Sequence, residues 1–437
     1  MLSDPIAALA TPPGRSAIAV VRLSGDGAFD IAARVVPAFR PAPRLAQLAA
    51  FVASDGAVID RGILTVFPAP HSYTGEDTVE FSCHGGLLAP LRLLEALHAA
   101  GARSASPGEF TRRAVLNGRL DLLQAEAVGD LIDATAPAQA GRALAQLDGN
   151  LSSRIAQLRS ALVELQALLG YEIDFPGEDD GPVAPERIAA ARDEVAARID
   201  LLLATAPAGE RLREGALVVL AGRPNAGKSS LFNALLGSER ALVTEIAGTT
   251  RDAIEAHTSF LGWPVRLVDT AGLRDTDDRI ERMGVETSRR WLESADLVLH
   301  CVETGAEAPS DGLPPLRTLT LGTKSDLAGP RGDGIAVSAV TGEGLEAVRR
   351  AVVEHLFGVR AALADLEPGL SRARHREALA RARSELEDAR PHFGREGDAV
   401  LASHHVRLAT LALDELVGVV DIEEVLDRVF RDFCVGK

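Results

Sequence analysis

The chain has little cysteine and few aromatic residues, and each shortage excludes a class of protein. Among 437 residues there are three cysteines, Cys83, Cys301 and Cys434, which lie far apart in the sequence. Three cysteines without paired spacing exclude a zinc ribbon and argue against a disulfide framework, which favours a reducing, cytoplasmic environment. Aromatic residues make up 4% of the chain, too few for the stacking surfaces that bind single-stranded nucleic acid.

Positive charge and long apolar runs are also scarce. The formal net charge is -16, so we expect no DNA partner, because contacts to phosphates need clustered cations. An RNA partner would have to be held by a local patch or by a pocket for one base. No apolar run approaches the length of a membrane span, and no signal-peptide pattern opens the sequence, so we expect no membrane partner.

Lysine occurs only at Lys228, Lys324 and Lys437. Because arginine supplies nearly every other basic side chain, a retained lysine indicates a position that needs a compact ammonium group. The terminal CVGK places a cysteine where a prenylation box has one, but its glycine and lysine do not fit that signal. We therefore reject a lipid anchor, and an accidental terminal lysine remains an alternative.

Hydrophobic periodicity divides the chain into α+β, helical and α/β parts. Strand patterns at 16–25 and 77–86 belong to a mixed α+β region. A helical pattern runs from 119 to about 205 and is interrupted by an acidic Gly/Pro loop at 175–186. Strands and helices alternate from 216 to about 358, and a helical pattern then returns.

From these segments we expect an α/β domain inserted into a helical one. Neither helical half has an evident reason to fold alone, so the two halves should pair. The expected domains are an N-terminal α+β domain at 1–117, a helical domain formed by 118–211 and 365–437, and the inserted α/β domain at 212–364.

A phosphate-binding loop is encoded in AGRPNAGKSSLFNALLG (221–237), which follows a strand pattern and opens a helical one. In this G-x-x-x-x-G-K-S pattern, Gly222 and Gly227 permit the tight turn whose backbone N–H groups surround phosphates. Lys228 supplies positive charge to the terminal phosphates, and Ser229 offers a hydroxyl to Mg²⁺. For the loop alone, a glycine-rich turn without a ligand is the default alternative.

Three further motifs at predicted strand ends remove that alternative. Asp269 of DTAG would support Mg²⁺, and Gly272 can sense the terminal phosphate through its backbone. Asp326 of TKSD can accept hydrogen bonds from two N–H groups of guanine, which adenine does not offer. The backbone of VSA (337–339) would donate to the guanine carbonyl. Four such motifs on one doubly wound sheet indicate GTP.

Two positions depart from common GTPase patterns. Thr323 replaces the usual asparagine of N-K-x-D and keeps a hydroxyl, and we expect it to loosen the base pocket. Leu273 follows DTAG where many small GTPases have a glutamine that orients the attacking water. Leucine cannot hydrogen-bond, so hydrolysis needs another polar residue and another positive charge.

Several nearby residues are candidates for these two tasks. Glu281 can orient the water, and Asn225 in the phosphate loop can hold a monovalent cation where an arginine finger would reach. The alternatives that the sequence leaves open are Asp275, Asp277 and Asp278 for the water, and Arg251 and Arg274, which also fit solvated switch residues, for the charge.

Six stretches together resemble the MnmE (TrmE) family of bacterial tRNA-modification GTPases. They are GRPNAGKSSL, EIAGTTRD, DTAGLR with a downstream glutamate, SYTGEDTVEFSCHGG, RLDLLQAEAV and the terminal FCVGK. The resemblance covers the whole chain in the same domain order. It implies an N-terminal α+β domain that forms a homodimer and binds 5-formyl- or methylene-tetrahydrofolate, a discontinuous helical domain, and an inserted Ras-like P-loop GTPase domain.

The resemblance also implies an activity. With an FAD-dependent partner of the MnmG or GidA type, the family installs an aminomethyl or carboxymethylaminomethyl group on the wobble uridine of certain tRNAs. Its G domains meet across the dimer in a potassium-dependent way, and GTP hydrolysis is coupled to the modification.

Position by position, the resemblance assigns contacts to GTP and its cations. Glu281 falls at the family's water-orienting glutamate, and Lys228 and Asn225 join it as catalytic positions. The K⁺ positions are Asn225, Thr244, Ile246 and Thr249, and the Mg²⁺ positions are Ser229, Thr250 and Asp269. The GTP-binding positions are Asn225, Ala226, Gly227, Lys228, Ser229, Ser230, Thr244, Glu245, Ile246, Ala247, Gly248, Thr249, Thr250, Asp269, Thr270, Ala271, Gly272, Thr323, Lys324, Asp326, Ser338 and Ala339.

The resemblance places the folate contacts elsewhere in the chain. The matching positions are Arg22, Glu80, Arg119 and Lys437. Arg119 is a departure, because the family commonly has lysine there. Cys434 matches a C-terminal cysteine at the modification centre. The adjacent Cys83 and His84 are too few for a metal and are expected to form a strand-end turn that lines the folate pocket.

Two other classes of protein share some of these features. A ribosome-assembly or regulatory GTPase would bind RNA without modifying it, but such proteins usually carry a basic appendage. A folate-dependent aminomethyltransferase with a structural nucleotide site would not need the intact set of Lys228, Ser229 and Asp269.

Overall fold

The computed structural model forms two compact units, which are described separately. The first comprises residues 1–129, 152–159 and 410–437, and the second comprises 130–151 and 160–409. The residues that the structure describes are 3–174, 184–237, 254–269, 289–304, 317–327, 334–358, 369–393, 397–418, 429–430, 433–434 and 436.

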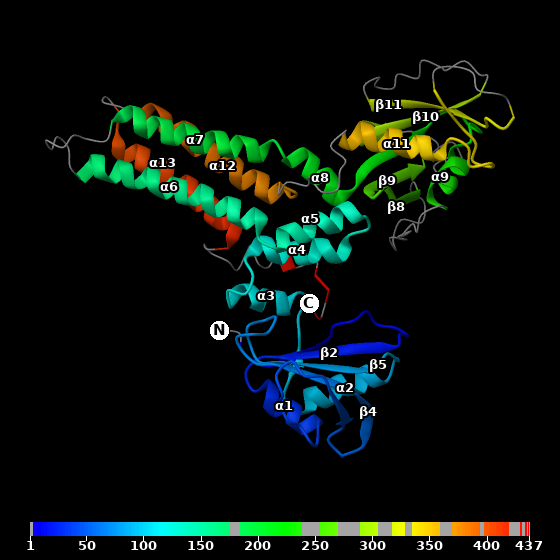
Figure 1. The fold of residues 1–437 in the computed structure, drawn as a ribbon, viewed down its shortest axis with the longest axis vertical. Helices are drawn as coiled ribbons and strands as arrows, with labels where there is room; N and C mark the ends of the chain where they lie inside the picture. The colour runs from blue at the N-terminus through cyan, green and yellow to red at the C-terminus, as the bar shows by residue number, and fades with distance from the viewer. Residues whose placement is uncertain are drawn as a thin grey trace, which may run out of the picture. The chain divides into compact units, whose positions relative to one another are not determined.

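The first unit contains a six-stranded sheet in the order β3-β4-β5-β2-β1-β6 (Figure 1). Neighbouring strands are antiparallel except for β1 and β6, which are parallel. The strands are β1 (Ile6–Leu9), β2 (Ile18–Ser24), β3 (Gln47–Val52), β4 (Val58–Phe67), β5 (Thr78–His84) and β6 (Arg103–Ser104). The expected mixed α+β fold of the N-terminal region is confirmed.

Side chains alternate between the two faces of this sheet. Val21 of β2 and Phe81 of β5 pack in one core with the apolar sides of α1 and α2 (Figure 1). Because successive side chains of a strand point to opposite faces, Arg22 and Glu80 lie on the other face. Phe110 of α3 belongs to a separate apolar cluster there. The helices are α1 (Ala28–Val35), α2 (Ala89–Ala99) and α3 (Glu109–Leu116).

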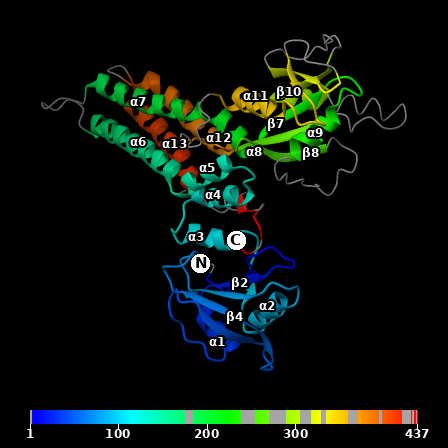
Figure 2. The same ribbon diagram turned by 45° about the vertical axis from the view of Figure 1, so that its right-hand side comes forward.

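Outside the N-terminal α+β region and the α/β domain, most of the described residues are in helices. α6 buries an apolar stripe that includes Leu158, Leu162 and Leu165. α7 precedes the α/β domain and α12 follows it, yet the two pack against each other (Figure 2). The bounds are α4 (Leu122–Asp133), α5 (Pro137–Leu147), α6 (Asn150–Asp174), α7 (Pro185–Leu203), α8 (Ala206–Glu214), α12 (Ala373–Ala389), the 3₁₀-helix η3 (Arg390–His392) and α13 (Ala399–Val417).

The α/β domain in the second unit has a sheet in the order β12-β11-β10-β7-β9-β8. β8 is antiparallel to β9, and the other neighbouring pairs are parallel. This arrangement confirms the expected inserted, doubly wound domain. The strands are β7 (Ala216–Ala221), β8 (Ile254–Phe260), β9 (Trp263–Asp269), β10 (Leu297–Glu303), β11 (Thr318–Thr323) and β12 (Ile335–Val337).

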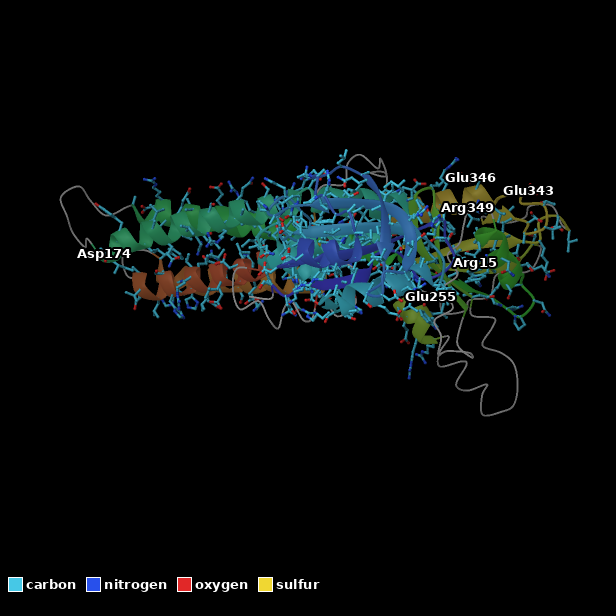
Figure 3. The ribbon with its side chains drawn as sticks, turned by 90° about the horizontal axis from the view of Figure 1, so that it is seen from below. Arg15, Asp174, Glu255, Glu343, Glu346 and Arg349 are labelled. Carbon is cyan, nitrogen blue, oxygen red and sulfur yellow. The ribbon has the colours of Figure 1, made fainter. Side chains whose placement is uncertain are left out.

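Helices α9 (Lys228–Leu236) and α11 (Leu345–Phe357) cover this sheet. Arg349 of α11, labelled in Figure 3 beside Glu346, is buried and donates to the carbonyl oxygen of Leu235 at the end of α9 (3.2 Å). Its guanidinium also lies 5.9 Å from the ring centroid of Phe260 in β8. One side chain thus connects α11, α9 and β8. Within the described residues no helix is both long enough and apolar enough to span a membrane.

Candidate functional site

The phosphate loop connects the end of β7 to the start of α9. Gly222 has a φ of +142°, and a Cβ there would collide with the carbonyl oxygen of Cys301 in β10. Gly227 and Asn225 also have left-handed backbone conformations, with φ of +83° and +63°. Only glycine fits at 222, and asparagine is one of the few other residues that readily adopt a left-handed conformation.

The Lys228 side chain lies within this loop and donates hydrogen bonds to its backbone. This side chain is buried, and its Nζ donates to the carbonyl oxygens of Gly222 (3.0 Å) and Arg223 (2.9 Å). The next two residues, Ser229 and Ser230, are exposed in the first turn of α9. An ammonium, two hydroxyls and a helix N-terminus therefore meet at one place, and this combination suits a polyphosphate.

Asp269 lies beside this loop because β9 pairs with β7. It is the last residue of β9, is opposite Leu220 in the parallel register, and is 2% exposed. The remaining predicted residues of this region, Thr244–Thr250, Thr270, Ala271, Gly272 and Glu281, lie outside the described residues. Their assignments stay predictions.

The predicted base-recognising residues gather at the ends of β11 and β12. Asp326 is exposed and accepts a hydrogen bond from the Oγ of the buried Ser338 (2.6 Å). The backbone N–H of Ser338 donates to the carbonyl oxygen of Glu343 (3.0 Å). Ser338 therefore positions the Asp326 carboxylate, and its own backbone N–H is used within the chain.

Thr323 connects the base end of the site to the phosphate end. Its side chain is 3% exposed, and its Oγ1 donates to the carbonyl oxygen of Ala226 (2.7 Å) in the phosphate loop. Our expectation that the loss of asparagine loosens the pocket does not match this geometry, because the hydroxyl ties the two segments together. The neighbouring Lys324 has a φ of +59° and its Nζ lies 3.2 Å from the Oε1 of Glu303.

A second candidate site lies on the sheet of the first unit, around Arg22. Arg22 and Glu80 are directly opposite in the antiparallel register of β2 and β5. The Nε and Nη2 of Arg22 both donate to the Oε1 of Glu80, at 3.0 and 2.8 Å. The guanidinium lies 5.5 Å from the ring centroids of both Tyr73 and Phe110. We call these four residues the Arg22 site.

The sequence did not single out the two aromatic members of the Arg22 site. Tyr73 lies within the SYTGEDTVEFSCHGG stretch, so a local signal existed. Phe110 lies in a different segment, and α3 places it beside Arg22. No local sequence pattern indicates this contact. Burial raises the pKa of the Tyr73 phenol, which stays protonated and shares a hydrogen bond with Thr111 (2.9 Å).

A buried arginine supports the region around the Arg22 site. Arg113 is 1% exposed, and its guanidinium contacts Asp4 (3.0 Å), Glu76 (3.1 Å) and Glu109 (2.9 Å). Because a buried charge needs complementary partners, these carboxylates hold the N-terminal segment, the Tyr73 loop and α3 to one another. No pattern in the sequence indicates this network.

Arg119 and the C-terminal tail are two other predicted folate contacts in the first unit. The aliphatic part of Arg119 lies against Gly75, near Tyr73 in the chain, and Arg119 is exposed. Gly436 has a φ of +100°, is buried, and sits against the backbone of Leu9 and Ala10. Lys437 itself lies outside the described residues.

The tail also contacts the start of α3. The N–H of Gly108 donates to the carbonyl oxygen of Cys434 (3.3 Å), and Phe430 and Phe433 pack against Gly108. The thiol-bearing residue Cys434 is exposed. Of the described tail residues, Cys434 therefore lies at the start of α3 and Gly436 lies beside β1, the neighbour of the strand that carries Arg22.

The expectation that Cys83 and His84 together line the folate pocket does not fit their positions. Cys83 packs in the core on the face opposite Arg22, and burial raises the pKa of its thiol to about 11. His84 is exposed, and its Nδ1 lies 2.8 Å from the Oδ1 of Asp60. Strand alternation separates these two neighbours.

Two family models match consecutive parts of the chain. The family model described as "GTP-binding protein TrmE N-terminus" matches residues 5–119, and that described as "MnmE helical domain" matches residues 122–434. Among solved structures, the G domain of the FeoB iron transporter of T. maritima is 28% identical over 32% of this chain and 98% of that one. Its TM-score of 0.26 is too low to carry an inference.

Full-length relatives align with the chain from end to end. Proteins named tRNA modification GTPase MnmE are 47% identical in one strain of Thermus thermophilus, 44% in Phenylobacterium zucineum and 41% in Akkermansia muciniphila. Each alignment covers 100% of this chain and 100% of the relative. The chain belongs to the MnmE (TrmE) family of tRNA modification GTPases.

Proposed function

We propose that this GTPase uses GTP hydrolysis to drive addition of an aminomethyl or carboxymethylaminomethyl group to the wobble uridine of certain tRNAs. It would act in the cytoplasm as a homodimer, together with an FAD-dependent partner of the MnmG type and a one-carbon tetrahydrofolate. The observation that carries the proposal is the joined phosphate and base site in a chain whose whole length aligns with tRNA modification GTPases.

The residues present fit GTP with Mg²⁺. Lys228 and the N-terminus of α9 would face the phosphates, Ser229 and Asp269 would hold the magnesium and its water, and Asp326 would select guanine. The bound magnesium would neutralise charge that develops on the phosphate oxygens. In the chain itself, the Thr323 hydroxyl ties the end of β11 to the phosphate loop, and the Ser338 hydroxyl holds the Asp326 carboxylate.

Potassium fits the same loop. Asn225 is exposed next to the phosphate-binding turn, so its carboxamide oxygen is open to a monovalent cation. Such a cation supplies positive charge, which the chain needs because Leu273 follows DTAG. We expect GTP hydrolysis to be much faster in KCl than in NaCl, and Asn225→Ala to remove most of that difference. Equal rates in the two salts would rule out the potassium site.

Glu281 is the proposed water-orienting residue. Glu281→Ala should leave GTP affinity intact and slow turnover at saturating GTP, whereas Asp278→Ala, its matched control in the same acidic stretch, should do neither. Single-turnover hydrolysis and binding of a fluorescent GTP analogue separate the two effects. Weaker GTP binding with unchanged turnover at saturation would assign Glu281 a different role.

The Arg22 site fits a folate. The partly exposed guanidinium of Arg22, which is supported by the rings of Tyr73 and Phe110 and lies next to the Glu80 carboxylate, offers charged hydrogen-bonding groups that suit a pterin ring with amide-like edges. Arg22→Met should weaken binding of 5-formyltetrahydrofolate by about tenfold or more in a fluorescence or calorimetric titration, since a lost charged hydrogen bond costs about 1.5–3 kcal/mol. The exposed Arg15, labelled in Figure 3, provides the matched control Arg15→Met, which should bind normally.

The alternative of an RNA-binding assembly GTPase has less support. The net charge of -16 leaves no excess of cations for a basic RNA-binding appendage. Loss of modification without any effect on ribosome assembly in cells that lack the gene would separate the two functions.

A further inference from the structure

Two carboxylates and an imidazole gather between α12 and α13. Glu385 and Asp388 belong to α12, His405 belongs to α13, and one ligand atom from each lies within 4.8 Å of the others. The Nδ1 of His405 is 2.7 Å from the Oε2 of Glu385. In the part of the chain that the structure describes, no other three His, Cys, Asp or Glu side chains meet in this way.

The helices place these three groups without distortion. Glu385 and Asp388 are three residues apart, so their side chains share one face of α12. His405 lies on α13 and contributes the third side chain of the cluster. Its ring is stacked nearly parallel on His392, with centroids 6.0 Å apart and planes 7° apart, and His404 contacts it edge-on at 5.7 Å. These ring contacts fix the direction in which the Nδ1 points.

Two of the three side chains of the cluster are partly buried, and all three remain accessible to solvent. The side chains of Glu385 and His405 are 28% and 24% exposed, and Asp388 is exposed. A cation could therefore enter from solvent while two of its ligands stay packed between helices. Because Asp388 is exposed, its carboxylate has room to rotate toward the other two groups.

The donor set selects the kind of cation. One imidazole nitrogen and two carboxylate oxygens are ligands of zinc and of similar first-row divalent metals. Magnesium prefers an all-oxygen octahedron and is disfavoured by the imidazole. Three protein ligands leave one tetrahedral position for water. We propose that Glu385, Asp388 and His405 form a site for a divalent transition metal. A metal bound there would connect α12 to α13, and zinc is the metal used to test the site.

A plain interhelical contact is the competing explanation, since a carboxylate and an imidazole at 2.7 Å also form an ordinary hydrogen bond. The two explanations differ in what added metal does. A cation that binds the folded chain stabilises it increasingly as its concentration rises, whereas a hydrogen bond between two side chains has no such dependence.

Calorimetric titration of zinc into the chelator-treated full-length chain, without nucleotide, tests the proposal. We expect a site with a stoichiometry of one per chain, and a zinc affinity reduced by about tenfold or more in His405→Gln and in Asp388→Asn, because each removes one of three ligands. His355→Gln, which changes an exposed histidine of α11 outside the cluster, is the matched control and should retain the affinity. Added zinc should raise the melting temperature of the wild type and of this control, and added magnesium should not.

Circular dichroism of each variant checks that it folds. The proposal is overturned if folded His405→Gln binds zinc as tightly as the wild type, or if the wild type binds no zinc at this stoichiometry. In the second case Glu385 and His405 form only an interhelical contact.

Discussion

At the scale of one residue, Thr323 joins the end of β11 to the phosphate loop through a single hydroxyl. Thr323→Val keeps the shape but leaves the Ala226 carbonyl, which lies in a buried residue, without this donor. An unsatisfied buried acceptor costs about 1–3 kcal/mol, so we expect GDP affinity to fall about tenfold in Thr323→Val. Titration with a fluorescent GDP analogue measures this.

Thr323→Ser supplies the control for this prediction, because it keeps the hydroxyl and loses only a methyl group. Its affinity should stay close to that of the wild type. If the valine variant binds GDP as tightly as the serine variant, the hydroxyl does not couple the two ends of the site.

At the scale of elements, paired charges hold the N-terminal segment to β6 and α3. A hydrogen bond from Arg103 lowers the pKa of Asp4 below its ordinary value of 3.8. For Glu109 burial acts in the opposite direction, but hydrogen bonds from Arg103, Ser106 and Arg113 outweigh it and lower the pKa overall.

A carboxyl group with a lowered folded-state pKa contributes stability above its unfolded-state pKa, and this stability is lost as the pH falls through the folded-state value. The first unit should therefore lose stability below about pH 4. Asp4→Asn should be less stable than the wild type at neutral pH, and the difference should shrink below about pH 4. Urea unfolding at a series of pH values measures this, with the exposed Asp26→Asn as control. A difference that does not depend on pH would contradict the account.

The C-terminal tail is the other element with a specific test. At Gly436 an added Cβ would collide with the carbonyl oxygen of Leu9, and the φ of +100° disfavours any other residue. Gly436→Ala, or deletion of the last four residues, should spare GTP hydrolysis and strongly reduce tRNA modification. Gly56→Ala is the control, since Gly56 also has a positive φ of +82° but open space around it. Normal modification in the truncated protein would make the tail dispensable.

At the scale of the whole molecule, the sequence predicted the order of the parts and the G-domain motifs. These motifs could be predicted because each follows a strand pattern, and parallel strands end at the same edge of a sheet. The Arg113 network, the ring of Phe110 and the contact from Thr323 to Ala226 could not. Each joins residues that are distant in sequence, and only tertiary packing brings them together.

The central claim joins two activities of one chain, GTP hydrolysis and tRNA modification. The most direct measurement is mass spectrometry of wobble uridines in tRNA from cells that lack this gene, complemented with the wild type or with Lys228→Ala. The account predicts that the aminomethyl or carboxymethylaminomethyl group is missing without the gene, returns with the wild type, and does not return with Lys228→Ala. Fully modified wobble uridines in cells that lack the gene would contradict it.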